Sequence, residues 1–278
     1  MKKIIQYIGL ALLVAVIYLG TRAYIALDDA EVFKTPVYET TPPQLPAELS
    51  APAVLVFSKT NSFRHHGAIA AANALFKELA EYHQLAIFFT ENGAVHNATQ
   101  LAKFKVIIWN NNTGDVLTTE QRAALKHYIE NGGHWLGIHG AGGSREYSWQ
   151  WYPQCLLRAT FVGHTLFPQF QTGVLDIEDR NHPATRHLPA RWQWFDEWYS
   201  FEQSPRSRGV HVLASLDESS YQPRLDHLLM DNDHPLIWTH NVGQGTVFYT
   251  ALGHNGSAYQ QPEYRRLLEN TLLWLIEK

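Results

Sequence analysis

Residues 132–143, which read GGHWLGIHGAGG, decide how the fold is interpreted. Residues 134–138 form a short apolar run of the strand type, with glycines before it. The strand is expected to end at His139, because the small residues after it give the backbone freedom rather than side chains to pack. In open α/β sheets the carboxyl ends of the strands are where ligands bind, so His139 is the first candidate site residue. The alternative is a tight glycine turn that the histidine merely caps.

The pattern around this stretch alternates between strands and helices, which predicts a parallel sheet covered on both faces. Buried strands are predicted at 53–58, 85–90, 106–110 and 134–138, with helices at 68–82 and 119–130. Further along, the patterns predict strands at 173–177 and 211–216, a hairpin of 235–240 with 246–250, and a closing helix at 262–276. A short helix fits 149–157. The predicted fold class is α/β, a three-layer, doubly wound, mostly parallel sheet of the flavodoxin-like kind.

The bulk composition narrows the class of protein. The formal charge of -4 over 278 residues offers no basic field, so no nucleic-acid partner is expected. The single cysteine, Cys155, excludes an internal disulfide and a cysteine-based zinc cluster. Fifteen histidines instead point to metal binding or acid–base chemistry.

The N-terminus is predicted to lie outside the folded domain. Residues 1–27 carry two lysines and then a nearly unbroken apolar run, which indicates one transmembrane helix that anchors the chain. Acidic residues after the span place the domain outside the cytoplasm, periplasmic or extracellular. A cleaved signal peptide is the alternative. Residues 28–52 are a Pro-rich linker, and the folded domain is expected at 53–278.

Several short motifs together carry a family resemblance. In chain order they are Phe63-Arg64-His65, Gly132-Gly133, Gly137-Ile138-His139-Gly140, Gly163-His164, His182-Pro183, Asp196-Glu197 with Tyr199, Pro235 with Trp238, Gly243 with Gly245, Val247-Phe248-Tyr249, Leu252-Gly253-His254 and Trp274. On these motifs residues 53–278 resemble the trehalose-utilisation (ThuA-like) family, whose fold is similar to class I glutamine amidotransferases. The resemblance implies a role in sugar metabolism and a small carbohydrate as partner, and related domains accompany domains thought to act on keto-sugars.

The amidotransferase comparison also excludes an activity. Those enzymes carry a nucleophilic cysteine in a G-x-C-x-G elbow after a strand. The corresponding residues here read Gly137-Ile138-His139-Gly140-Ala141, so a histidine takes the place of the cysteine. Cys155 lies well past the turn and cannot substitute. A cysteine-based glutaminase mechanism is therefore excluded.

Five residues are the candidates for the chemistry: His65, His139, His164, Glu197 and His254. The histidines follow apparent strands or lie at turns, and such loops can converge on one crevice of a doubly wound sheet. They could bind a divalent metal such as zinc, or share acid–base roles without a metal. The sequence leaves both possibilities open and assigns no cofactor, because no H-x-x-x-H or H-E-x-x-H motif is present.

Five more residues are candidates for binding substrate: Arg64, Asn111, Asp196, Trp198 and Tyr199. Arg64 would pair with a substrate carboxylate or phosphate, or else form a salt bridge to Asp196 or Glu197. The aromatic surroundings of Asp196 and Glu197 predict a raised carboxyl pKa, which would suit Glu197 as a general acid.

The resulting functional hypothesis is hydrolytic or lyase-type cleavage of a small glycoside, perhaps an oxidised keto-glycoside. His139 and His164 would serve as general base or metal ligands. Two alternatives stay open: a non-catalytic sugar-binding or scaffolding domain, and a sugar isomerase or epimerase that uses two histidines as an acid–base pair.

Overall fold

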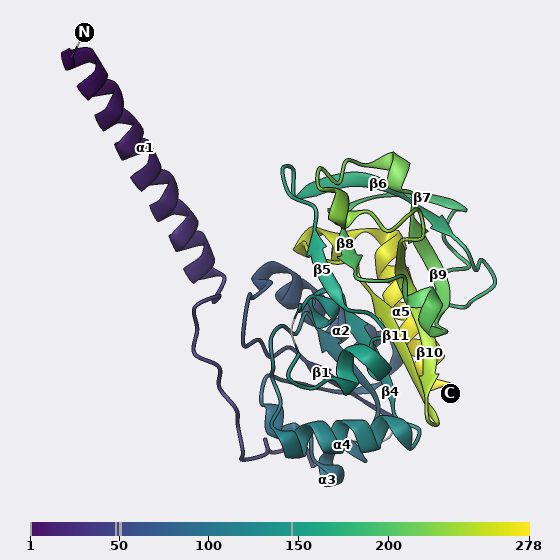
Figure 1. The fold of residues 1–278 in the computed structure, drawn as a ribbon. Coiled ribbons are helices and arrows are strands. Elements are labelled where there is room, and N and C mark those ends of the chain that lie inside the picture. Colours follow the sequence, from purple (N-terminus) through teal and green to yellow (C-terminus); the bar gives the residue numbers. More distant parts are fainter. Residues whose placement is uncertain (1, 48, 50–51, 146) are drawn as a thin grey trace.

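A mixed sheet forms the centre of the domain (Figure 1). The computed structural model describes residues 2–47, 49, 52–145 and 147–278. Within these residues the sheet has nine strands in the order β2-β1-β3-β4-β11-β10-β9-β6-β7. Their bounds are β1 (Ala53–Phe57), β2 (Ala86–Thr90), β3 (Phe104–Asn110), β4 (His134–Ile138), β6 (Phe170–Ile177), β7 (Arg191–Glu197), β9 (His211–Leu216), β10 (Pro235–Val242) and β11 (Gly245–Thr250). Strands β5 (Phe161–His164) and β8 (Tyr199–Phe201) pair separately.

The sheet has a parallel half and an antiparallel half. Strands β2, β1, β3, β4 and β11 pair in parallel. From β11 onwards, β10, β9, β6 and β7 pair in antiparallel fashion. Strands β1 and β4 are buried along their whole length, as expected of parallel strands covered on both faces. The predicted α/β class and the predicted hairpin of β10 with β11 are confirmed.

Helices cover both faces of the parallel half. The bounds of the helices are α2 (His66–His83), α3 (Ala98–Leu101), α4 (Thr119–Glu130) and α5 (Pro262–Ile276). The connections from β1 to β2 and from β3 to β4 run in opposite directions along the sheet, so right-handed crossovers place α2 and α4 on opposite faces. Helix α5 lies beside α2, where Arg265 contacts Glu78 at 2.6 Å and Glu269 contacts His83 at 2.7 Å. The result is the three-layer arrangement.

The N-terminal helix α1 (Lys2–Asp29) stands away from the domain (Figure 1). Its apolar stretch is exposed and is long enough to cross a membrane, by length and composition. The helix continues to Asp29, two residues beyond the predicted span. The following segment has no helix or strand at 34–40, as the proline pattern predicted, but it is not a free linker. Val37 bonds to Asn61, and Glu39 contacts the Lys59 ammonium at 2.6 Å.

The middle of the chain is where the sequence prediction was incomplete. The aromatic-rich segment from Arg191 onwards is strand β7, in which buried and exposed side chains alternate. Strands β5 and β8 were not predicted, because each is only three or four residues long. The helix expected within 149–157 is one π-helical turn, Tyr152–Leu156.

Gly245 at the start of β11 provides a stability test. A Cβ at this position would overlap the backbone oxygens of Ile129 and Gly133, and neither can move without disturbing the end of α4. G245A is therefore expected to lower the free energy of unfolding by about 3 kcal/mol. Denaturant unfolding of the detergent-solubilised full chain, followed by tryptophan fluorescence, measures the change.

The matched control is G67A in α2, where a Cβ would meet only the Gly256 amide nitrogen, at 3.9 Å. There alanine should be neutral or stabilising by up to about 1 kcal/mol. Equal denaturation midpoints for G245A and G67A would contradict the close approach of the Ile129 and Gly133 oxygens to Gly245.

Candidate functional site

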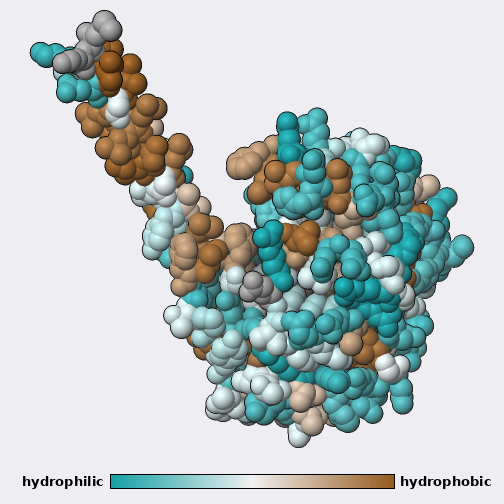
Figure 2. Space-filling model, in the orientation of Figure 1, coloured by the Kyte–Doolittle hydropathy of each residue, from teal (hydrophilic) through white to brown (hydrophobic). Residues whose placement is uncertain are grey.

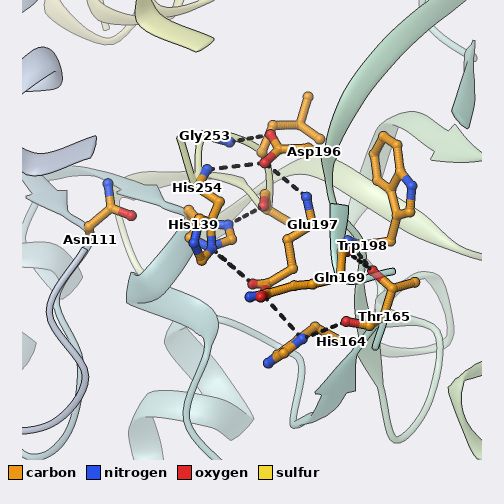
Figure 3. A network of polar contacts seen from close by, with 12 residues as sticks. Asn111, His139, His164, Thr165, Gln169, Asp196, Glu197, Trp198, Gly253 and His254 are labelled. Atoms are coloured by element: carbon orange, nitrogen blue, oxygen red, sulfur yellow. Dashed lines mark hydrogen bonds and ion pairs between the residues drawn. The ribbon is translucent and has the colours of Figure 1, made fainter. Parts of the chain in front are cut away.

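Three strands of the parallel half place histidines at one edge of the sheet. His65 lies between β1 and α2, His139 directly follows β4, and His254 follows β11. Glu197, the last residue of β7, reaches the same point from the antiparallel half (Figure 3). One ligand atom from each of these four residues lies within 4.8 Å of all the others. The structure thus brings together four residues that the sequence analysis selected from distant loops.

The backbone fixes the orientation of the His139 ring. Its Nδ1 lies 2.7 Å from the carbonyl oxygen of Ala251, which can only accept a hydrogen bond, so Nδ1 carries the proton. Its Nε2 consequently faces the cluster, 3.1 Å from Nδ1 of His254 and 3.5 Å from the Glu197 carboxylate. A histidine whose second nitrogen donates to a backbone carbonyl is oriented as metal-bound histidines are.

His65 is buried and neutral in this environment. Burial and the neighbouring rings of His139 and His254 hold its pKa well below the usual value. Its ring centroid lies 4.9 Å from that of His139 and 4.6 Å from that of His254. Within the described residues its Nδ1 is buried with no hydrogen-bond partner. A buried nitrogen without a partner is costly unless a ligand satisfies it.

The expected raised pKa of Glu197 is wrong. Burial acts to raise it, but hydrogen bonds with His139 and His254 outweigh burial and hold the pKa well below the usual range. The carboxylate lies 3.1 Å from Nδ1 of His254 and 3.1 Å from Nδ1 of His164, and the Gln169 amide also donates to it. Imidazoles, rather than the nearby aromatic rings, surround the carboxyl group. Glu197 is therefore an ionised ligand or hydrogen-bond acceptor, not a general acid.

His164 lies at the end of β5 and is the most exposed member of the group, with 32% of its side chain accessible. Its Nδ1 lies 2.9 Å from the carbonyl oxygen of Thr165 as well as near the Glu197 carboxylate. Both neighbours accept hydrogen bonds, so Nδ1 carries the proton and Nε2 is left as a lone pair. This nitrogen is on the part of the ring that solvent and a ligand in the cavity can reach.

Asp196 has a different role from the predicted substrate contact. Its carboxylate is fully buried and accepts four hydrogen bonds from within the protein. The donors are the backbone N–H groups of Glu197, Gly253 and His254, at 3.0, 2.7 and 3.2 Å, and the Trp194 indole at 2.9 Å. Asp196 therefore holds the His254 loop against the end of β7 and cannot reach a substrate.

Three other predicted substrate contacts do not line the cavity beside the cluster. Arg64 pairs with Glu91 at 2.6 Å rather than with Asp196 or Glu197. Asn111 is buried against Tyr259 and Asn110. Trp198 is fully buried, because its side chain packs on Gly173. Tyr199 does line the cavity, and its ring lies 4.2 Å from that of His139.

The cavity itself has a volume of about 490 Å³, within the range of small-molecule sites. His65, His164, Glu197 and His254 form part of its wall. Aromatic rings, hydroxyl groups and an arginine complete it: Phe63, Phe161, Tyr199, Ser62, Thr113, Ser144 and Arg145. This mixture of aromatic faces and short polar groups suits a molecule with the polarity of a sugar. Sequence reasoning missed Phe161, the first residue of the unpredicted strand β5, and Gln169, which lies in the loop after it.

The donor set fits a divalent transition metal. Three imidazole nitrogens and one carboxylate oxygen are ligands typical of zinc and of similar ions. Nε2 of His139 already faces the cluster, and His65 has a nitrogen without a partner in the described structure. Nδ1 of His254 lies 3.1 Å from both Nε2 of His139 and the Glu197 carboxylate. A metal binds such nitrogens in their deprotonated form.

Comparison with known proteins gives a consistent family. The family model for ThuA, described as trehalose utilisation, matches residues 53–275. A solved ThuA-like protein from Bacteroides uniformis is 25% identical with a TM-score of 0.71, over 84% of this chain and 95% of that one. A ThuA-like protein from Parabacteroides merdae is 16% identical with a TM-score of 0.60, over 81% and 89% of the two chains, and shows the fold alone. No curated protein matches the chain.

The buried carboxylate of Asp196 can be tested by D196N. The amide keeps one acceptor oxygen but places an NH₂ group against backbone donors, so the free energy of unfolding should fall by about 3 kcal/mol. Chemical denaturation of the full chain in detergent measures the loss.

D226N, at an exposed aspartate, is the control and should lie within about 0.5 kcal/mol of the wild type. If D196N unfolds at the same denaturant concentration as D226N, Asp196 does not join the two parts of the site.

Proposed function

The chain belongs to the ThuA family, described as trehalose utilisation, and from this premise we propose that it is a metal-dependent enzyme that cleaves a small keto-glycoside. One observation carries the proposal: four ligand atoms from His65, His139, Glu197 and His254 lie within 4.8 Å of one another, beside a sugar-sized cavity. A carbohydrate-binding module needs aromatic faces and hydroxyl groups. It does not need three imidazoles gathered around a buried carboxylate.

The four residues would hold one divalent metal, with the Glu197 carboxylate offsetting part of its charge. When bound, such an ion supplies a Lewis acid that polarises a carbonyl oxygen. A keto-sugar presents a carbonyl, and a simple glycoside does not. The donor set therefore favours a substrate that has been oxidised before it reaches this site.

His164 is the proposed proton carrier. Its Nε2 is a lone pair on a ring that lines the cavity, and its Nδ1 proton is held by Thr165 and Glu197. Nε2 would take the proton from the carbon next to the carbonyl. The bond between the β-carbon and the glycosidic oxygen then breaks, and the leaving oxygen receives a proton from the His164 imidazolium. The products are an unsaturated keto-sugar and the free alcohol.

This lyase route fits the site better than direct hydrolysis of the glycosidic bond. Hydrolysis needs a protonated acid for the leaving group, and the depressed pKa of Glu197 removes the carboxyl group proposed for that task. An isomerase or epimerase would begin with the same proton transfer and return the proton elsewhere, so product analysis separates it from the lyase.

We also propose that α1 anchors the domain to a membrane, with the domain outside the cytoplasm. The helix is apolar over the span from Lys3 to Asp29, with basic residues before it and acidic residues near its end. The alternative, a cleaved signal peptide, would leave the domain soluble after export.

A deuterium experiment tests the reaction. The zinc-loaded full chain is incubated with an enzymatically oxidised keto-disaccharide in D₂O, and the sugars are analysed by mass spectrometry and NMR. We expect release of the second sugar and deuterium at the carbon next to the carbonyl in recovered substrate. H164A should slow the release of the second sugar and the incorporation of deuterium by at least about 100-fold, with the zinc content unchanged.

H187A is the control, because His187 bonds to the Glu263 carbonyl and does not line the cavity. It should behave as the wild type does. Cleavage that yields a saturated keto-sugar without deuterium would indicate hydrolysis, and tight binding with neither cleavage nor exchange would support the sugar-binding alternative.

A further inference from the structure

The segment that follows α1 is fastened to the loop that carries His65. We call residues 29–43 the strap. The carbonyl oxygen of Ala30 accepts a hydrogen bond from the Arg64 backbone N–H at 2.7 Å, and that of Asp29 lies 3.0 Å from Nε2 of His66. The strap therefore contacts both chain neighbours of His65. The end of α1 is therefore held by the two residues that flank His65 of the candidate site.

The rest of the strap runs along the same edge of the sheet. Glu39 contacts Lys59 after β1 and the Gly93 backbone N–H after β2, at 2.6 and 2.9 Å. The carbonyl oxygens of Glu39, Thr41 and Pro43 accept hydrogen bonds from Gln121, Asn92 and Gln100. The contacts with Lys59, Gly93 and Asn92 fix the strap on the loops after β1 and β2, at the carboxyl edge where the cavity opens. The direction of α1 relative to the cavity is therefore constrained by the domain itself.

Exposed apolar side chains gather on both sides of the cavity. Outside α1, nine large apolar side chains are exposed in the described part of the chain. Three are on the strap: Phe33, Val37 and Tyr38. Four are on two loops beside β5: Leu166, Phe167, Leu225 and Leu229. Loop 165–169 ends in the cavity residue Gln169, and the turn with Leu225 and Leu229 packs on β5 and β8.

Phe167 is the most exposed of them, with 85% of its surface accessible. Its loop, between β5 and β6, projects from the side of the domain that faces α1 (Figure 1). Figure 2 shows the apolar coat of α1 and, across from it, apolar side chains at the near edge of an otherwise mostly hydrophilic face.

We call the seven exposed side chains on the strap and beside β5 the rim. We propose that the rim rests in the surface of the bilayer that α1 crosses, so that the cavity opens at the membrane surface. The inference rests on the proposed membrane anchoring by α1 and is independent of the reaction. A bilayer is the occupant that fits, because the exposed groups lie on both sides of the cavity mouth and continue the apolar surface of α1. A protein partner bound across them would close the cavity. Substrates then enter along the plane of the lipid headgroups.

Depth-dependent quenching tests the proposal on the full chain. Cys155, the only cysteine, is replaced by serine, and F167C is labelled with an environment-sensitive nitrobenzoxadiazole dye. The protein is reconstituted into vesicles of phosphatidylcholine and phosphatidylglycerol with or without lipids that carry a nitroxide near the headgroup. The matched control is Y82C, since Tyr82 is 78% exposed but lies at the far end of α2. L229C gives a second position on the rim.

We expect nitroxide lipids to quench the dye at 167 and 229 at least threefold and to leave the dye at 82 within about 10% of its unquenched value. Equal, weak quenching at 167, 229 and 82 would overturn the proposal. A label at I17C, inside α1, reports insertion of the helix: quenching there without quenching at the rim overturns only the membrane-facing rim. If the dye is quenched neither at position 17 nor at the rim positions, the anchoring is overturned as well. Metal content and turnover, measured on the same samples, report separately on the proposed function.

Discussion

A single buried carboxylate, that of Asp196, joins the two halves of the sheet at the site. It accepts N–H groups from the end of β7 and from the loop after β11, so the antiparallel half delivers Glu197 to the place where the parallel half delivers its histidines. Within the sheet itself the two halves are joined where β10 pairs with β11. A buried carboxylate that loses one of its four donors loses stability, so the end of β7 and the loop after β11 depend on each other.

The electrostatics of the cluster follow from this arrangement. Glu197 is an ionised carboxylate almost without solvent, and imidazole and amide N–H groups from His254, His164 and Gln169 replace its hydration. His65 contributes a neutral ring with a nitrogen that has no partner in the described chain, and the Ala251 carbonyl orients His139 so that its Nε2 faces the cluster. Nitrogen ligands around one carboxylate attract a cation, and a small divalent ion satisfies all of these groups together.

Much of this arrangement could be predicted from the sequence. Apolar runs that end in glycine or polar loops indicated the parallel strands, and parallel strands end at one edge, so His65, His139 and His254 were expected there. The neighbours of Glu197 were beyond such reasoning. Three residues adjacent in sequence have three different surroundings. Asp196 accepts hydrogen bonds from backbone N–H groups, Glu197 faces the histidines, and Trp198 packs in the core. The ion pair of Arg64 with Glu91 and the hydrogen bond of Gln169 to Glu197 depend on loop conformations, which no sequence periodicity predicts.

The central claim is that His65, His139, His254 and Glu197 share one metal ion. X-ray absorption at the zinc edge of the full chain, loaded with one equivalent of zinc, tests it most directly. We expect a first shell of three imidazole nitrogens and a carboxylate oxygen at about 2.0–2.1 Å, with imidazole scattering reduced by one third in H254A. A first shell of oxygens alone, or a spectrum that H254A leaves unchanged, would contradict it.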